Sequence, residues 1–96
     1  MKAFQVVWSE KAASDLRQIK NFISYDKPQA ARSLIEKIKS RAERLTRFPQ
    51  SGRIVPELSR NEIREIVVGN YRVIYKLSGR RVLILTVFEA HRTPLF

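Results

Sequence analysis

The chain contains no cysteine and only one histidine, His91, among its 96 residues. Without cysteine it can form neither a disulfide nor a thiolate metal site, and one histidine cannot build a multi-histidine site. No apolar run approaches the roughly 20 residues that a membrane-spanning helix needs, and the N-terminus has no signal-peptide core. We therefore expect a cytoplasmic protein without a metal ion or other cofactor.

Acidic residues are also scarce: nine Asp and Glu stand against nineteen Lys and Arg, which gives a net charge of +10 at pH 7. Twelve of the nineteen cations are arginines, which can pair with phosphate or carboxylate in a bidentate manner. Such an excess attracts nucleic acid, an anionic lipid surface or an acidic protein, although a basic surface can also serve solubility alone. The length suits a single domain over residues 1–96.

The first half of the chain predicts a strand followed by two helices. Residues 3–8 are rich in β-formers, and the strand that they predict carries Phe4, Val6 and Trp8 on one face. Ser9 can cap a helix in which apolar residues recur to about Tyr25, and Pro28 is well placed in the first turn of a second helix. So short a break predicts an antiparallel helical hairpin that packs on a sheet.

The second helix has the most regular pattern. Its apolar stripe consists of Ala31, Leu34, Ile35, Ile38, Ala42 and Leu45. The other side is strongly basic and carries Arg32, Lys37, Lys39, Arg41, Arg44 and Arg47, with Glu36 and Glu43 between them. This side can simply face solvent; if it binds a ligand, nucleic acid is the first candidate.

The second half predicts an antiparallel meander. Three β-forming runs, 63–68, 71–77 and 82–88, are separated by Gly69-Asn70 and Ser78-Gly79, pairs that tolerate the positive φ of tight turns. Residues 48–56 are turn-like and connect the helices to the meander. The expected fold is therefore α+β: an N-terminal strand, a helical hairpin and a three-stranded meander.

Pairing across Gly69-Asn70 predicts which residues share a face of the meander. The core face would carry Ile66, Val68, Tyr71, Val73, Tyr75 and Leu77, with Arg64 at its end. The last strand is apolar on both faces, with Val82, Ile84 and Phe88 on one and Leu83, Leu85 and Val87 on the other. Such a strand needs cover on its second face, either from loops or the tail of this chain or from a protein partner.

Polar residues of the second half could carry chemistry. They are Arg53, Arg64, Tyr71 and Arg72, followed by Glu89, His91 and Arg92 after the last strand. Arginines around a phosphate could support RNA cleavage, with Glu89 or His91 as the base that withdraws the 2′-hydroxyl proton. Cross-strand pairing of the charged residues and a surface position for the histidine explain the same residues without catalysis.

Several segments together resemble the RelE/ParE superfamily of bacterial toxins from toxin–antitoxin operons, in the expected order over essentially the whole chain. They are Trp8-Ser9-Glu10-Lys11-Ala12 with Asp15-Leu16, Pro28 with Ala30-Ala31, Leu45 with Phe48-Pro49 and Gly52-Arg53, Ile63-Arg64-Glu65, Tyr71-Arg72-Val73-Ile74-Tyr75, and His91-Arg92. The resemblance implies the same order of a strand, a helical hairpin and a meander.

The resemblance implies different targets in its two branches. RelE-type toxins are ribosome-dependent mRNA endonucleases, and in this chain the matching catalytic residues would be Arg64, Arg72, His91 and Arg92. The chain departs from that branch: it has no lysine pair before the meander, Val67 where an arginine is expected, and Phe96 instead of a final tyrosine. The hairpin and the segments around Phe48 and Ile63 are closer to the ParE branch, whose members poison DNA gyrase without a known hydrolytic site.

Either branch implies a cognate antitoxin with an acidic toxin-binding segment, and hence a hetero-oligomer. Residues that bind the target or a nucleic acid would be Arg53, Arg64, Tyr71, Arg72 and Arg92. The antitoxin would contact the second sheet face at Ile74, Leu83, Leu85 and Val87. We therefore expect a gyrase-inhibiting toxin that is not an enzyme; the alternatives are an mRNA endonuclease that acts on the ribosome, and a non-toxic relative that binds an antitoxin or has a regulatory role.

Overall fold

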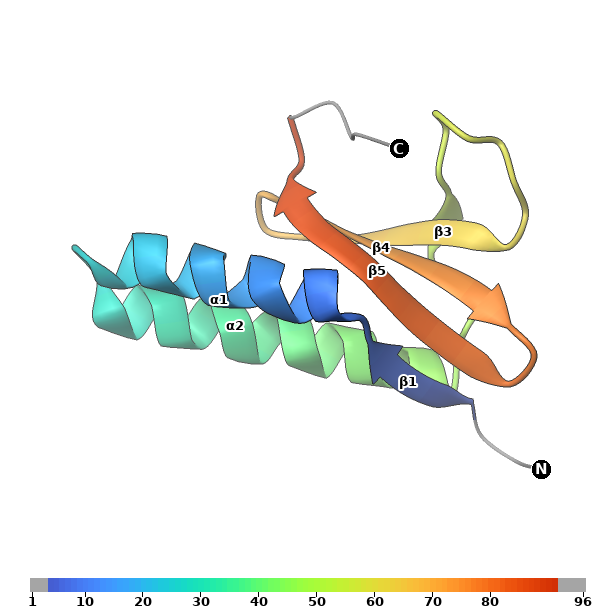
Figure 1. Cartoon of the computed structure of the whole chain (residues 1–96), viewed down its shortest axis with the longest axis horizontal. Helices are drawn as coiled ribbons and strands as arrows, with labels where there is room; N and C mark the ends of the chain where they lie inside the picture. The colour runs from blue at the N-terminus through green and yellow to red at the C-terminus, as the bar shows by residue number, and fades with distance from the viewer. Residues whose placement is uncertain (1–3, 92–96) are drawn as a thin grey trace.

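A five-stranded mixed sheet carries two helices on one face (Figure 1). The computed structural model describes residues 4–91. The strand order is β1-β5-β4-β3-β2, with bounds Gln5–Trp8 for β1, Arg53–Ile54 for β2, Ile63–Val68 for β3, Tyr71–Ser78 for β4 and Arg81–Glu89 for β5. β1 runs parallel to β5, and the other neighbours are antiparallel. The most apolar strand, β5, therefore lies inside the sheet.

The helical hairpin forms as the sequence predicts. Helix α1 spans Glu10–Ser24 and helix α2 spans Pro28–Glu43, followed by a short 3₁₀ helix, η1, at Arg44–Thr46. The Ser9 hydroxyl accepts a hydrogen bond from the Ala12 amide at 3.0 Å, which satisfies one of the free amides at the start of α1. Pro28 occupies the first turn of α2, where no amide is needed.

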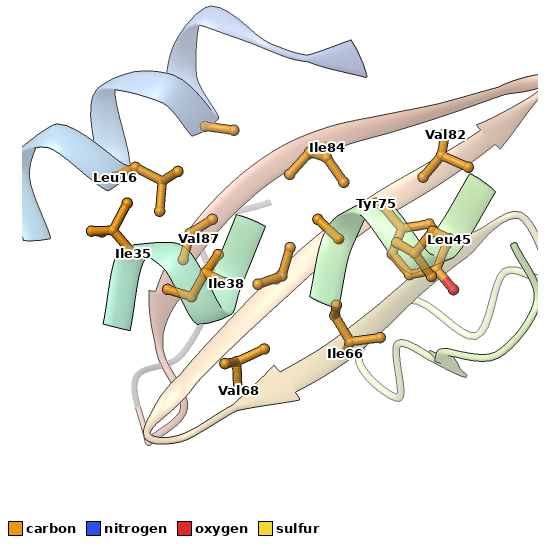
Figure 2. Packing of buried hydrophobic residues seen from close by; sticks show 13 residues of the cluster. Leu16, Ile35, Ile38, Leu45, Ile66, Val68, Tyr75, Val82, Ile84 and Val87 are labelled. Atoms are coloured by element: carbon orange, nitrogen blue, oxygen red, sulfur yellow. The ribbon is translucent and has the colours of Figure 1, made fainter. Parts of the chain in front are cut away.

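The main core lies between the helices and the sheet (Figure 2). Its buried members are Ala12, Leu16, Ile35, Ile38, Ala42, Leu45, Ile66, Val68, Val73, Tyr75, Val82, Ile84 and Val87. Phe4, Val6 and Trp8 pack against this cluster, which confirms the predicted face of the first strand. Phe22, which follows the apolar stripe of α1 in sequence, is 82% exposed and takes no part in the core.

The β3–β4 hairpin has the predicted register. Val68 lies opposite Tyr71, Ile66 opposite Val73, and Arg64 opposite Tyr75. Gly69 has a φ of +58°, so the turn requires the left-handed conformation that glycine adopts at little cost. The core face of the meander is consequently the one that simple alternation predicts.

The predicted faces of β5 are wrong for Val87 and Phe88, because the strand contains a β-bulge. Tyr75 pairs with Ile84 whereas Ile74 pairs with Thr86, so Leu85 is an extra residue in the ladder. The insertion reverses the alternation that follows. Val87 therefore joins the core under the helices, at 3% exposure, and Phe88 lies on the opposite face.

The second face of the sheet is covered by the chain itself, as one of the two alternatives predicted. Val55 is buried with Ile63 and Ile74, and Leu58, Leu85 and Phe88 pack against these three residues. The segment 55–62, which we term the strap, follows the two-residue strand β2, and the sequence did not predict that strand. Ile74 was expected to contact an antitoxin on this face, but its side chain is 0% exposed beneath the strap.

Within residues 4–91, no helix is both long and apolar enough to cross a membrane.

Candidate functional site

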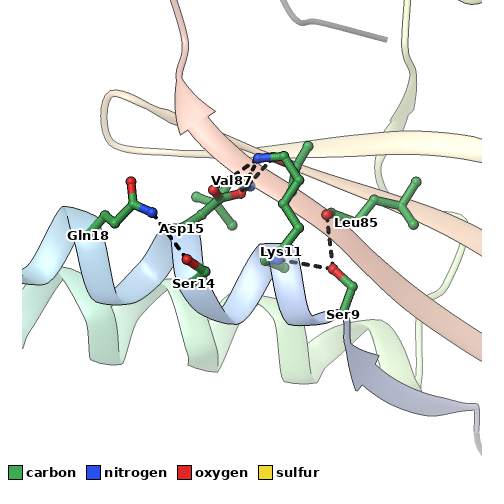
Figure 3. Close-up of polar contacts among 9 residues, drawn as sticks. Ser9, Lys11, Ser14, Asp15, Gln18, Leu85 and Val87 are labelled. Atoms are coloured by element: carbon green, nitrogen blue, oxygen red, sulfur yellow. Dashed lines mark hydrogen bonds and ion pairs between the residues drawn. The ribbon is translucent and has the colours of Figure 1, made fainter.

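The bulge in β5 is held by polar groups of α1 (Figure 3). The Ser9 hydroxyl donates to the Leu85 carbonyl at 3.0 Å. The Asp15 carboxylate accepts from the Val87 amide at 2.9 Å and from the Thr86 hydroxyl at 2.7 Å. These contacts satisfy groups of β5 just beyond the end of its pairing with β1, so the start of α1 holds the point at which β5 changes face. The sequence signal was the Ser9…Asp15 segment, but nothing in it indicated that β5 would be the partner.

A network of alternating charges crosses the second face of the sheet. Glu65 on β3 is fully buried and accepts hydrogen bonds from Arg53 on β2 and from Arg72 on β4, the latter at 2.7 Å from Arg72 Nε. Arg72 also donates to both oxygens of Glu57 in the strap, at 2.9 Å each. The Arg72 guanidinium lies 5.2 Å from the centre of the Phe88 ring, within the range of a cation–π contact. Arg72 thus joins two strands and the strap.

The electrostatics of this network favour its charged form. The hydrogen bonds from Arg72 lower the pKa of Glu57 from 4.5 to about 2. The same bonds raise the pKa of Arg72 above its ordinary value, despite its burial. The Arg72 side chain is only 7% exposed, so the prediction that it faces a target or a phosphate is wrong: its donors serve Glu57 and Glu65. The sequence predicted cross-strand pairing in general terms and missed Glu57 as a partner.

Arg64 is also engaged within the fold. Its guanidinium donates to the carbonyls of Gln50, Gly52 and Asn61, at 3.0 to 3.2 Å, and to the Asn61 side chain. Nearby, the Tyr75 hydroxyl donates to the Pro49 carbonyl at 2.8 Å and accepts from the Gly52 amide at 2.9 Å. Burial raises the pKa of Tyr75. Arg64 and Tyr75 therefore hold the loop that leads into β2.

Among residues 4–91, Arg64 and Arg72 are not brought together with the predicted base Glu89. Arg64 lies opposite Tyr75, whereas Glu89 lies opposite Tyr71, four residues along the same strand and about 13 Å away at the rise of a β-strand. Tyr71 and Arg72 are adjacent in β4 and point to opposite faces. Within residues 4–91, the predicted base Glu89 is therefore remote from Arg64 and lies on the opposite face of the sheet from Arg72.

The end of β5 presents the remaining predicted residues. His91 Nε2 lies 3.1 Å from a carboxylate oxygen of Glu89, and the histidine side chain is 74% exposed. Tyr71 is half-buried and packs against the main core. Arg92 lies outside the residues that the structure describes. Among the predicted binding residues within 4–91, Arg53 has a largely exposed side chain, at 64%.

A groove of about 380 Å³ lies between the two helices beside β1, and the sequence did not predict it. Its apolar lining comes from Trp8, Ala13, Leu16 and Ile35. Its cationic lining consists of Arg17, Lys20 and Lys39, all exposed and without an ion pair to any residue among 4–91. The groove therefore suits a ligand with an apolar side and negative flanks.

The four residues predicted to contact an antitoxin divide between surface and interior. Leu83 and Leu85 are half-buried on the second face, whereas Ile74 and Val87 are buried inside the protein. A partner on this face could reach only the first two without rearrangement of the strap. Among residues 4–91, no cluster of three or more His, Asp or Glu side chains could hold a metal ion.

Comparison with known proteins identifies close similarities. A family described as "ParE toxin of type II toxin-antitoxin system, parDE" matches residues 6–94. The chain is 33% identical to the Toxin RelE2 of Caulobacter vibrioides over 88 residues, which cover 92% of this chain and 97% of the relative.

Two solved structures share the fold. One is described as a chromosomal ParDE system from P. aeruginosa, with a TM-score of 0.78 at 18% identity, covering 93% of this chain and 98% of the other. The second is the toxin–antitoxin complex RelBE2 from Mycobacterium tuberculosis, with a TM-score of 0.62 at 23% identity, covering 91% and 98% of the two chains. The α+β architecture predicted from the sequence is confirmed.

Proposed function

This chain belongs to the ParE toxin family of type II toxin–antitoxin systems, and on that premise we propose that it inhibits DNA gyrase by binding and that a cognate antitoxin neutralises it. The family membership makes the chain a toxin component. Gyrase as its target and the antitoxin as its partner are our proposal.

Arg64 and Arg72 are both engaged in hydrogen bonds within the fold. Arg72 is saturated by two carboxylates, and Arg64 donates to three backbone carbonyls. A nuclease needs cations and a base that converge on one phosphate. Since these arginines stabilise the fold and, among residues 4–91, are not brought together with the predicted base Glu89, the arrangement favours a toxin that acts through its surface.

The antitoxin is proposed to contact two surfaces. The groove lined by Arg17, Lys20 and Lys39 offers apolar floor and positive flanks, which suit an amphipathic acidic helix. The half-buried Leu83 and Leu85 on the second face provide a further apolar contact. The net charge of +10 would accelerate the encounter with an acidic partner.

A supercoiling assay tests the gyrase proposal. Relaxed plasmid, purified gyrase and ATP are titrated with the toxin, with and without the acidic protein encoded beside the toxin gene. We expect loss of supercoiling or accumulation of cleaved plasmid, reversed by the antitoxin. Full supercoiling at a large molar excess of toxin would overturn the gyrase target.

Charge removal at the groove tests the antitoxin contact separately. The triple variant Arg17→Gln, Lys20→Gln, Lys39→Gln should bind the antitoxin more weakly in calorimetry while its effect on gyrase is retained. A matched triple variant outside the groove, Lys27→Gln, Arg32→Gln, Arg81→Gln, removes the same charge and should bind nearly as well as the parent. Equal weakening in both would indicate that only net charge matters.

Messenger RNA cleavage on the ribosome is the second candidate, favoured by the similarity to a toxin named RelE2 and by the exposed His91–Glu89 pair. Primer extension on mRNA from a cell-free translation reaction would detect it. Cleavage that disappears in His91→Ala, without loss of antitoxin binding, would support this candidate over gyrase. Intact mRNA at toxin concentrations that arrest gyrase would exclude it.

A further inference from the structure

The solvent side of α2 carries two distinct rows of charge. The first, which we term the mixed row, alternates in sign at helical spacing and consists of Arg32, Glu36, Lys39, Glu43 and Arg47. The second, the basic row, contains only Lys37, Arg41 and Arg44, at positions i, i+4 and i+7. Residues at these separations are neighbours on a helix surface, so opposite charges lie next to one another in the mixed row, without an ion pair among residues 4–91, and like charges lie next to one another in the basic row.

The cations of the basic row have no carboxylate partner within residues 4–91. Lys37 and Arg44 are exposed, and Arg41 is half-buried. One helical turn rises about 5.4 Å, so the row presents positive groups at intervals of roughly 5 to 6 Å along a line. No carboxylate among residues 4–91 pairs with these cations, and a polyanion along the row would relieve the repulsion between them.

An exposed aromatic ring follows the basic row. The Phe48 amide donates to the Arg44 carbonyl at 3.1 Å, so Phe48 lies one helical turn beyond Arg44. Its side chain is 59% exposed, although phenylalanine is usually buried. An exposed aromatic ring thus follows the three cations at the C-terminal end of α2 and η1.

We propose that Lys37, Arg41, Arg44 and Phe48 form a binding site for single-stranded nucleic acid, a property additional to inhibition of gyrase. The cations pair with successive phosphates, and the Phe48 ring stacks on a base. Grooves that bind single strands combine these two elements, positive charge along the backbone and aromatic platforms for bases. A single strand is favoured over a duplex because base stacking inside a duplex hides the faces on which Phe48 could stack. The repeating single-sign row also matches a regular polyanion better than the irregular charge of a protein surface.

Fluorescence anisotropy tests this site with a labelled oligothymidine of about 20 nucleotides and a duplex of the same length. The full chain is titrated at several KCl concentrations between about 50 and 200 mM. Each phosphate contact contributes about 0.7 to the slope of log K against log salt for a single strand. The triple variant Lys37→Gln, Arg41→Gln, Arg44→Gln should therefore lower the slope by about 2 and weaken binding.

The mixed row provides the matched control. The variant Lys27→Gln, Arg32→Gln, Arg47→Gln removes two cations of the mixed row and the neighbouring Lys27, leaves the groove cations in place, and should keep a slope close to that of the parent. Glutamine has a helix propensity similar to that of lysine and arginine, and thermal melting of both variants checks that the fold is kept. Equal losses in the two variants would overturn the proposal, because they would show attraction by net charge alone.

The role of the ring is tested by Phe48→Leu, which keeps an apolar side chain and removes the aromatic face. Affinity for oligothymidine should fall about tenfold with an unchanged salt slope, and affinity for the duplex should not change. Tighter binding of the duplex than of the single strand, or no effect of Phe48→Leu, would overturn the single-strand site. Loss of antitoxin binding in the basic-row variant, with oligothymidine binding intact, would instead assign the row to a protein partner. None of these outcomes depends on whether gyrase is the target.

Discussion

The two faces of the sheet are covered by different kinds of side chain. The face under the helices is a continuous apolar cluster in which α1, α2 and four strands meet. The face under the strap combines a small apolar cluster around Val55 with the charged network of Arg53, Glu57, Glu65 and Arg72. Every buried side-chain N or O among residues 4–91 has a hydrogen-bond partner, so the network is complete.

Because of this difference, we expect substitutions on the two faces to affect the stability of the fold differently. An apolar cluster loses stability in proportion to the volume removed, and it accepts conservative replacement. A buried ion network depends on every member, because removal of one charge leaves another buried without a partner. The helix face is therefore expected to be tolerant, and the strap face to fail when a single member is removed.

The largest effect should follow from Glu65→Ala. Glu65 is fully buried and binds two arginines, so its loss leaves Arg72 with Glu57 alone in a site with little solvent. We expect the free energy of unfolding to fall by about 3 to 5 kcal/mol, measured by urea denaturation. The double variant Glu65→Ala, Arg72→Met should be more stable than Glu65→Ala. If the loss of the double variant equals the sum of the losses of Glu65→Ala and Arg72→Met alone, the ion network is not the cause of the Glu65→Ala effect.

Asp15→Ala is expected to lower the free energy of unfolding by a smaller amount. It removes a polar contact between α1 and β5 on the helix side of the sheet. The Asp15 carboxylate satisfies the Val87 amide and the Thr86 hydroxyl at the bulge. Its removal should cost about 1.5 to 3 kcal/mol in the same urea measurement, as for hydrogen bonds to a charged group. Asp15→Asn retains one acceptor and should recover part of the loss. Lys11→Ala, which removes only the exposed ion pair of Asp15, is the control and should change little.

Ile38→Val tests the tolerance of the apolar face. Ile38 is fully buried in the main core, and the change removes one methyl group. We expect a loss of about 0.5 to 1.5 kcal/mol, with the cooperativity of unfolding unchanged. A loss as large as that of Glu65→Ala would contradict the contrast between the two faces.

The smallest expected effect is the pH dependence of stability that results from Glu57. Its pKa is about 2 in the folded protein and 4.5 ordinarily, so its pairing stabilises the fold fully above about pH 4.5. That contribution is lost as the pH falls from about 4.5 to about 2, because protonation then breaks the pairing with Arg72. The stability difference between the parent and Glu57→Gln, followed by thermal melting, should shrink through this window. Ile38→Val should keep the pH dependence of the parent; a constant difference for Glu57→Gln would rule out the carboxylate as its source.

Prediction from the sequence succeeded where local pattern decides. The 3.6-residue period located the stripe of α2, Ser9 and Pro28 marked the helix starts, and Gly69-Asn70 set the β3–β4 register. It failed at Val87 and Phe88, because one extra residue reverses every later face of a strand and Leu85 looks like any other strand residue. It also failed at Arg72, since a buried arginine and a phosphate-binding arginine have the same sequence appearance until their partners are known.

The sequence by itself determined the order and type of the elements and the apolar stripes, because these depend on spacing between near neighbours. Its motifs over the whole chain also resemble those of a toxin superfamily. Only the tertiary structure decided that Ser9 and Asp15 hold β5 at its bulge, some 70 residues away. It likewise decided that Arg72 donates its hydrogen bonds to Glu57 and Glu65. It also brought Trp8, Leu16 and Ile35 together in the lining of one groove. The physical reason is that charge pairing and cavity shape depend on distances between remote segments, which no local period encodes.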